Sequence, residues 1–508
     1  MSYIGGIMEK SIIKLFKKVF LKYHYFLTLI AVCAYPCFFM AFLNVGEVDI
    51  SCVELPFVTY LCMGILLFCF CFIIIKDFTK TVFVASVIQI VLCNYVVINK
   101  TINMFVYCNY IAQTIIMVLL LVLISLVVKF KKIKIDYKTL CDIILVVVCL
   151  LLVVDGIMAG VKIYNSNQVQ KKDLKIVSNK DSDKNIYYLL FDEYGGEENL
   201  KHYFDFDNKE LYDYFGKNNF EVYKGTHNFE SIYTQEIVPN ILNLDYVAKV
   251  DGLASANVEL AKNARIFTFL KEKGYEIDMV NDGGFLCDEG CNIVGGDHYK
   301  PLNDEKKMIQ AIFNQGVISL AIDLFSDREY NFEQRKQSVQ IKQGLFDSYY
   351  EECKAGGNKK LLIGYICLPH GPFVFNHDGT VSDNNMVDDY KYYIEQLKYV
   401  NMEIQRIVDK ILKEDPNSII VIQSDHGARY ALANLGDYKK SEYDEIKETE
   451  MMQNVINCVY IGGEKVSLKQ KNTSSINTWR MILNKEFGTE LDEIEAEKYI
   501  LHWKVNVE

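Results

Sequence analysis

Arginine and acidic side chains are scarce in the first third of the chain. Residues 1–164 contain no arginine, 14 lysines and only 8 aspartates and glutamates, which gives a net charge of +6. The 508-residue chain as a whole has a net charge of −11, so the remainder carries −17. Such unlike parts exclude one uniform globular domain, and they also exclude a nucleic-acid binder built on a net-basic surface. The apolar, basic first part predicts a membrane protein that carries a large soluble domain.

The second part of the chain also lacks the cysteine pairs of a zinc motif. Ten of the 15 cysteines precede residue 150, mostly within apolar stretches, where a thiol behaves as a small apolar group. The five later cysteines are odd in number, and Cys287-x3-Cys291 has no second pair that would complete a zinc site. A local disulfide between Cys287 and Cys291 and two free thiols stay open as alternatives.

Five apolar stretches in the first part meet or approach the length of a membrane span. A helix needs about 20 mostly apolar residues to cross a bilayer, and the third stretch is the shortest. Asp155 lies near the end of the fifth, where we interpret it as marking a span boundary rather than an intramembrane relay. The predicted spans are Phe26–Val45, Leu55–Ile75, Val82–Ile98, Met104–Val128 and Leu140–Met158.

The placement of lysine predicts the orientation of these spans. Lysines precede the first span, separate the second from the third, and separate the fourth from the fifth, so all three groups fall on one side. Short cytoplasmic loops collect lysine, which places the N-terminus in the cytoplasm and everything after the fifth span outside. A cleaved signal peptide is the alternative for the first span, but no small-x-small site follows it convincingly. We expect a membrane anchor at 1–163, a linker at 164–185 and an extracellular domain at 186–508.

The second part alternates short apolar runs with helix-like segments. Helices are expected at Ala264–Lys273 and Asp388–Glu414. Strands are expected at Ile186–Phe191, Tyr275–Val280, Leu361–Cys367 and Ser418–Gln423. This alternation predicts an α/β domain in which a largely parallel sheet has helices on both faces. In such sheets the ligand binds beyond the carboxyl ends of the strands.

Three of the predicted strands lead directly into polar residues. The first ends in Asp192-Glu193, the third is followed by His370 between two prolines, and the fourth is followed by Asp425-His426. Each cluster alone has an ordinary interpretation as a turn or a cap. Together they predict a site, because carboxylate and imidazole are ligands for Zn and similar cations.

Thr234 becomes a candidate only beside these clusters. A threonine hydroxyl is a poor nucleophile until a base or a metal lowers its pKa. Any catalytic role for Thr234 therefore depends on the aspartate and histidine residues that the sheet brings near it.

Taken in chain order, these residues resemble the alkaline-phosphatase/sulfatase superfamily. Within it, they are similar to the membrane-anchored phosphoglycerol transferases of the lipoteichoic acid synthase type and to the phosphoethanolamine transferases. The resemblance covers about residues 186–430. Its motifs are Asp192 after the opening strand, Thr234 five residues before Pro239, Gly274-Tyr275 after a helix, His370-Gly371-Pro372 and Asp425-His426-Gly427.

The resemblance implies roles for individual residues. Thr234 would be the catalytic nucleophile, and His370 would act in catalysis and contact the substrate together with Arg429. One divalent cation, Mn, Zn or Mg, would be bound, and whether Asp192 or Glu193 is its main carboxylate ligand stays open. The implied ligand set is Asp192, Glu193, Thr234, Asp425 and His426.

The sequence departs from the family pattern at three places. The Asp192-Glu193 pair replaces the single glutamate usual in the transferases. No cysteine stands in the Cys-x-Pro/Ser-x-Arg context from which type I sulfatases form formylglycine, so sulfatase chemistry of that kind is disfavoured. The residues that follow Gly427 match neither transferase branch closely, which leaves the substrate head group open.

The resemblance implies metal-dependent transfer of a phosphoglycerol or phosphoethanolamine group. The donor would be a membrane phospholipid, the acceptor a cell-envelope glycan, polymer or lipid, and the intermediate a phosphothreonine. The enzyme would be a multi-pass plasma-membrane protein with an extracellular catalytic domain and no nucleic-acid partner. The alternatives are a sulfatase-like phosphodiesterase or sulfuric ester hydrolase, and a catalytically inactive scaffold of envelope assembly.

Overall fold

The structure of the protein is a computed structural model, and the chain forms two compact units in it. One unit comprises Met1–Tyr164 with Leu302–Asp327, and the other comprises Asn165–Pro301 with Arg328–Glu508. We call them the helical unit and the α/β unit. The structure describes residues 25–45, 49–105, 110–130, 135–167, 174–248, 254–282, 290–295, 304–319, 332–354, 359–384, 389–434, 444–462, 473–496 and 498–500.

The helical unit contains long apolar helices. Its elements are α2 (Phe26–Leu43), η1 (Ile50–Val53), α3 (Glu54–Ile75), α4 (Phe78–Cys93), α5 (Tyr95–Phe105), α6 (Tyr110–Phe130), α7 (Tyr137–Asn167, whose last residues belong to the α/β unit) and α13 (Asp304–Gln315). Among the described residues, three segments are long and apolar enough to cross a membrane: Phe26–Leu43, Ile50–Ile75 and Tyr137–Tyr164. Phe78–Cys93 and Thr114–Phe130 are shorter apolar helices. The number of five spans therefore stays a prediction.

The predicted third span is interrupted in the structure. Helix α4 ends at Cys93 and α5 begins at Tyr95, so one residue separates them. The side-chain amide of Asn94, between them, donates to the carbonyl oxygen of Ile90 at 2.9 Å. Asparagine competes for backbone hydrogen bonds in this way and favours helix ends. The predicted span Val82–Ile98 thus falls on two helices.

Many apolar side chains of the helical unit are exposed on its surface. Leu66 on α3, Phe130 on α6 and Met158 on α7 are 70%, 71% and 66% exposed. Apolar surface left in water costs roughly 25 cal/mol per Å². A helix that is apolar all round is typical of a lipid environment. The lysines before α2 and at 131–134 lie outside the described residues, so the orientation stays a prediction.

A mixed seven-stranded sheet forms the centre of the α/β unit. Strand order is β2-β7-β6-β1-β5-β3-β4. The five strands from β4 to β6 are parallel, whereas β7 and β2 are antiparallel to their neighbours. The strands are β1 (Ile186–Asp192), β2 (Glu221–Val222), β3 (Glu276–Asn281), β4 (Asn292–Ile293), β5 (Lys360–Pro369), β6 (Ile419–Ser424) and β7 (Asn457–Ile461). The four predicted strands are present, and the antiparallel edge makes the sheet less uniformly parallel than predicted.

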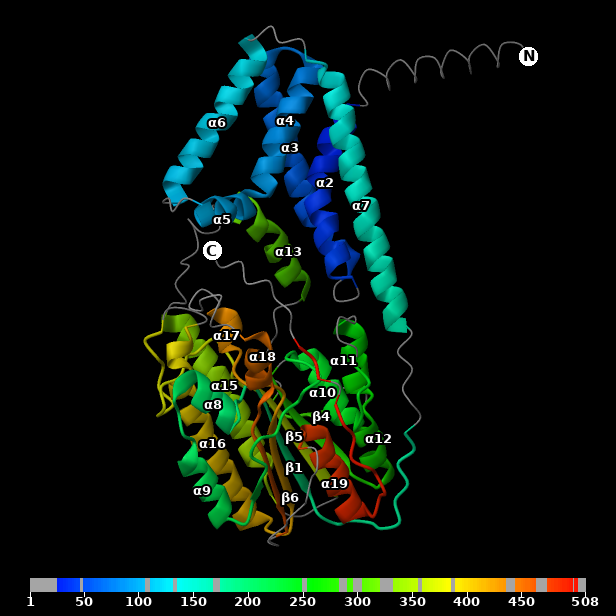
Figure 1. The fold of residues 1–508 in the computed structure, drawn as a ribbon, viewed down its shortest axis with the longest axis vertical. Helices are drawn as coiled ribbons and strands as arrows, with labels where there is room; N and C mark the ends of the chain where they lie inside the picture. Colours follow the sequence, from blue (N-terminus) through cyan, green and yellow to red (C-terminus); the bar gives the residue numbers. More distant parts are fainter. Residues whose placement is uncertain are drawn as a thin grey trace, which may run out of the picture. The chain divides into compact units, whose positions relative to one another are not determined.

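Helices cover both faces of this sheet, as predicted (Figure 1). The described helices are α8 (Glu197–Phe204), α9 (Lys209–Lys217), α10 (Thr234–Asn243), α11 (Ala254–Lys262), α12 (Arg265–Glu272), α15 (Phe332–Glu352), α16 (Tyr393–Glu414), α17 (Tyr430–Ala433), α18 (Glu445–Gln453) and α19 (Ser475–Phe487), with the 3-10 turn η2 (Tyr390–Tyr392) before α16.

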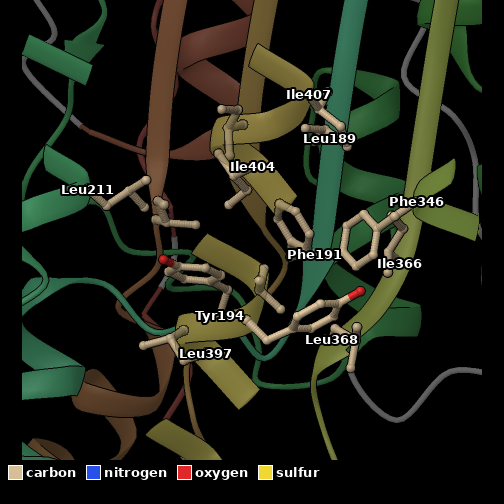
Figure 2. Packing of buried hydrophobic residues seen from close by; sticks show 14 of the residues in the cluster. Leu189, Phe191, Tyr194, Leu211, Phe346, Ile366, Leu368, Leu397, Ile404 and Ile407 are labelled. Carbon is tan, nitrogen blue, oxygen red and sulfur yellow. The ribbon is translucent and has the colours of Figure 1, made fainter. Parts of the chain in front are cut away.

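Strand β1 contributes to the core on both faces. Leu189 and Phe191 pack towards α16 and α15, where Ile404, Ile407 and Phe346 lie beside them (Figure 2). Tyr188 and Leu190 alternate with them and pack towards α10, α12 and α19. Successive side chains of a strand point to opposite faces, and a strand buried on both faces is apolar throughout. This explains the unbroken apolar run of β1.

Candidate metal and nucleophile site

The candidate residues lie at one edge of the sheet because their strands are neighbours. Strand β1 pairs with β5 on one side and β6 on the other, and all three run in the same direction. Their carboxyl ends therefore bring Asp192, His370 and Asp425 together. Thr234 is the first residue of α10, on the face of the sheet that α10 covers.

Asp192, Asp425 and His426 form a cluster that could hold a metal ion. One ligand atom from each lies within 4.8 Å of the others. His426 Nε2 is 3.5 Å from Asp192 Oδ1 and 3.6 Å from Asp425 Oδ2. All three side chains are buried. Two carboxylates and one imidazole are a donor set that suits a divalent cation such as Zn or Mn.

Two atoms of this cluster have no hydrogen-bond partner among the residues that the structure describes. They are His426 Nε2 and Asp192 Oδ1, both buried. His426 Nδ1 lies 2.9 Å from the carbonyl oxygen of Gly427 and donates to it, so Nε2 is the ring nitrogen that faces the aspartates. An unpartnered buried polar atom costs about 1–3 kcal/mol. A cation between the three side chains would satisfy both atoms, so the site fits a metal.

The charge of Asp192 also favours a metal ion at this site. Burial raises the pKa of its carboxyl, and the nearby carboxylate of Asp425 raises the pKa further. Holding two ionised carboxylates in a buried space is unfavourable unless a positive charge lies between them. A divalent cation would supply that charge.

Asp425 also fixes the Thr234 hydroxyl. Its Oδ1 accepts from the backbone N–H of His426 at 2.7 Å and from that of Glu193 at 3.2 Å. Its Oδ2 accepts from Thr234 Oγ1 at 2.5 Å. The Thr234 side chain is half-buried at the N-terminal end of α10, where backbone N–H groups favour a negatively charged ligand.

Glu193 has different surroundings from Asp192. Its Oε1 accepts from the Tyr390 hydroxyl at 2.5 Å and from the backbone N–H of Arg429 at 2.7 Å. Its backbone has a φ of 66°, in the left-handed region, and its carbonyl oxygen accepts from the Tyr393 hydroxyl at 2.8 Å. The cluster found among the described residues does not include Glu193, whose role as a metal ligand stays a prediction.

His370 and Arg429 lie together beside Glu193. Arg429 Nη2 is 2.9 Å from His370 Nε2, and His370 Nδ1 is 2.7 Å from the carbonyl oxygen of Gly371. Burial lowers the pKa of His370, but the carboxylates of Asp192 and Glu193 outweigh burial, and the pKa is raised overall. The side chains of His370 and Arg429 are 34% and 24% exposed, so both can contact a ligand.

Several supporting residues were not anticipated from the sequence. Tyr390 holds Glu193, and Asn228 donates to the carbonyl oxygens of Ser424 and Asp425 at 3.2 and 2.7 Å. Lys342 pairs with Asp282, which also accepts from the backbone N–H of Cys367. These residues come from separate elements and belong to no short motif, so no sequence pattern pointed to them.

Gly427 is required because a side chain at this position would clash with neighbouring segments. A Cβ atom at this position would lie 2.5 Å from the backbone oxygen of Asn454 and 2.7 Å from Asn199 Nδ2. The backbone N–H of Gly427 donates to the carbonyl oxygen of Met452 at 2.7 Å. Close packing against the segment before β7 therefore excludes any side chain after His426. Cys287 lies outside the described residues, so its pairing with Cys291 stays untested.

Comparisons with known proteins agree with the motifs. Residues 224–453 match the family model of sulfatases, a range that includes Thr234, His370 and Asp425 and begins after Asp192. A search of curated proteins finds no relative of the chain.

Several solved structures are similar to this chain. One is the C-terminal periplasmic domain of EcEptC from Escherichia coli in complex with Zn, with 13% identity, a TM-score of 0.39, and 62% of this chain and 85% of that chain covered. Another is lipooligosaccharide phosphoethanolamine transferase A, an integral membrane protein from Neisseria meningitidis (13%, TM-score 0.37, 86% and 87% covered). A third is a protein in the alkaline phosphatase superfamily from Vibrio parahaemolyticus (12%, TM-score 0.36, 64% and 74% covered). Identities and TM-scores are low, and the assignment rests on the family model. The match of residues 224–453 to the sulfatase family model agrees with the family resemblance of the motifs in the α/β unit.

Proposed function

We propose that the protein is a metal-dependent phosphotransferase in which Thr234 carries the transferred group. The group would be a phosphoryl-alcohol unit, phosphoglycerol or phosphoethanolamine, taken from a membrane phospholipid. The observation that carries this proposal is the 2.5 Å hydrogen bond from Thr234 Oγ1 to Asp425 Oδ2, because it places a hydroxyl against a buried carboxylate of the candidate metal cluster.

Thr234 is the nucleophile of the first half-reaction. Its Oγ1 attacks the phosphorus of the lipid head group, and the bond from phosphorus to the lipid alcohol breaks. Asp425 Oδ2 is the nearest acceptor for the hydroxyl proton. The product is a phosphothreonine, and diacylglycerol or a similar alcohol leaves.

His370 and Arg429 bind the phosphoryl oxygens or serve the leaving group. Arg429 offers a cationic donor to the phosphoryl oxygens, and His370 Nε2 lies 2.9 Å from Arg429 Nη2, so both side chains face the same part of the site. Glu193 and Tyr390 orient this pair, since Glu193 bonds to both Tyr390 and the Arg429 backbone.

Asp192, Asp425 and His426 would hold a divalent cation, with the Thr234 oxygen as a further ligand. When bound, the cation would supply stabilisation of the negative charge on the phosphoryl oxygens. In the second half-reaction a hydroxyl of an envelope glycan, polymer or lipid attacks the same phosphorus, and Thr234 is regenerated. The apolar helices are consistent with a membrane location beside the lipid donor.

Mass spectrometry of the protein purified from its own membranes tests the proposal. A phosphoglycerol or phosphoethanolamine adduct on Thr234 is the expected result, absent from Thr234→Ala and retained in Gln235→Ala, which changes the exposed neighbour of Thr234. An adduct on another residue would overturn the assignment of the nucleophile.

A labelled phospholipid separates transfer from hydrolysis. The transferase forms a modified glycan, polymer or lipid, whereas a phosphodiesterase releases the free head-group phosphate into water. A scaffold would form neither product, and Thr234→Ala would then complement a deletion strain as well as the wild type.

A further inference from the structure

One segment of the chain lies between two parts of the α/β unit in sequence but belongs to the helical unit in space. Residues Leu302–Asp327 cluster with Met1–Tyr164, whereas the residues up to Pro301 and from Arg328 cluster with the α/β unit. The chain therefore leaves the α/β unit, enters the helical unit and returns. The chain thus passes between the two units here as well as at the connection that follows α7.

Helix α13 of this segment packs into the core of the helical unit. It contacts α2, α3, α5 and η1 (Figure 1). Ile312 is fully buried and Met308 is 5% exposed, and both share a core with Leu29, Cys33 and Tyr60. Lys306, Gln310 and Asn314 are exposed. Helix α13 thus has one apolar stripe at a spacing of four residues and one polar stripe, and the apolar stripe is the buried one.

Polar contacts fix α13 and the turn after it at defined positions. The Tyr60 hydroxyl, fully buried, donates to the carbonyl oxygen of Ile312 at 3.0 Å. The backbone N–H of Val317 donates to the carbonyl oxygen of Leu92 at 2.7 Å. A Cβ atom at Gly316 would lie 2.9 Å from Tyr60 Oη and 3.1 Å from the Leu92 oxygen, so the backbone approaches these helices closely at this glycine. Such contacts hold α13 at one defined position on the helical unit. A helix surrounded only by lipid would lack such contacts.

We propose that residues 304–319 are a docking segment. Through noncovalent contacts, this segment attaches the chain of the α/β unit to the helical unit. Its binding surface is formed by η1, α2, α3, α5 and the end of α4, and its anchors are Met308, Ile312 and the Val317 N–H. The α/β unit is then attached to the helical unit in two ways: by the covalent connection after α7 and by the docked segment. This proposal does not depend on the proposed function.

Cutting the covalent connection tests the proposal. A protease site is inserted at 168–173 of the full chain, with an affinity tag at the N-terminus. After complete cleavage in mild detergent, the fragment that begins after the site is expected to co-purify with the tagged fragment. Ile312→Asp should reduce co-purification by about tenfold or more. An unpaired charge buried among apolar side chains weakens the binding free energy by at least about 1.4 kcal/mol.

Matched variants separate docking from general adhesion. Asn314→Asp places the same charge two residues away on the exposed side of α13 and should leave co-purification unchanged. Tyr60→Phe removes only the hydroxyl that bonds to Ile312, and it decides the result if Ile312→Asp does not fold. The Tyr60→Phe protein should release the fragment at a lower detergent concentration than the wild type does. Release of the wild-type fragment, equal loss in Asn314→Asp, or wild-type retention in both Ile312→Asp and Tyr60→Phe overturns the proposal.

Discussion

Asp192 and Glu193 are adjacent in sequence, yet their carboxylates make different contacts. Adjacent side chains at the end of a strand point in opposite directions, so two neighbouring carboxylates do not readily face one cation. Asp192 Oδ1 lies near His426, whereas Glu193 Oε1 accepts from Tyr390 and from the backbone of Arg429. The geometry favours Asp192 as the ligand and Glu193 as a residue that positions Arg429 and His370.

Isosteric substitutions distinguish these two roles. We expect Asp192→Asn to lower bound metal by about tenfold or more, a loss comparable to that caused by removing a supporting group of a metal site. Glu193→Gln should keep the metal content and lower kcat/KM by about tenfold or more, because the negative charge beside Arg429 is lost. Metal content by mass spectrometry and steady-state kinetics measure the two effects. Metal loss in Glu193→Gln would instead make Glu193 a ligand.

Glu230 is a buried acid outside the candidate cluster. Burial raises the pKa of its carboxyl to about 7. Because the pKa in the folded protein lies above that of the unfolded chain, the contribution of Glu230 to stability is fully present below about pH 4.5 and is lost as the pH rises through 7. A shift of this size corresponds to about 3 kcal/mol of unfolding free energy.

Replacing Glu230 should therefore remove part of the pH dependence of stability. Between pH 5 and pH 8, we expect the unfolding free energy of the wild type to fall by about 2–3 kcal/mol more than that of Glu230→Gln. Chemical denaturation in detergent at both pH values measures the difference. Glu210→Gln, which changes an exposed acid on α9, should keep the wild-type dependence. Equal dependence in all three proteins would show that Glu230 titrates normally.

At the scale of elements, the turn after β6 depends on the absence of a side chain at Gly427. A Cβ atom there would press against the backbone oxygen of Asn454, which cannot move without shifting the segment that leads into β7. Gly427→Ala should lower the unfolding free energy by roughly 1–3 kcal/mol, the usual cost of overpacking. It should also weaken metal binding, since the turn carries Asp425 and His426.

Gly216 provides the matched control for this substitution. It lies within α9, and a Cβ atom there would meet no atom of the described residues within 4 Å. Gly216→Ala should be neutral or stabilise the protein by about 0.5–1 kcal/mol, because alanine is the better helix former. Thermal unfolding of both variants checks the comparison. Similar losses in both would mean that the close approach at Gly427 can relax.

Elements with a strong pattern were predictable, and those with a weak one were not. The apolar runs of β1, β3, β5 and β6 and the stripe of α16 match the structure, because burial on both faces or on one stripe leaves a clear signal. Strand β7 is a short run at Asn457–Ile461 and was not predicted. Its antiparallel pairing with β6 arises from contacts far apart in sequence.

At the scale of the whole molecule, metal binding should be linked to the stability of the α/β unit. Removing the cation leaves Asp192 and Asp425 close together, and the raised pKa of Asp192 means that its destabilising effect grows as the pH rises. A cation at about 100 times its Kd stabilises the folded state by about 2.7 kcal/mol. Chelation should therefore lower the Tm, and by more at pH 7.5 than at pH 5.

Thermal unfolding with and without a chelator, followed by addition of Zn, Mn or Mg, measures this linkage. The cation that restores the Tm at the lowest concentration identifies the preferred metal. His426→Ala should have a low Tm that no cation raises, because the variant lacks one of the three side chains of the candidate cluster. A wild-type Tm that is insensitive to chelation and to added cations would argue against a metal site.

The sequence by itself determined the division into an apolar, lysine-rich part and an acidic α/β part, the central strands, and the residues at the strand ends. These properties follow from local composition and periodicity, which a short window of residues already contains. Only the tertiary structure decided that Asp192 rather than Glu193 faces His426, that Thr234 lies against Asp425, and that residues 304–319 pack among the apolar helices. Each depends on backbone direction and on contacts between distant segments, and a linear pattern does not encode them.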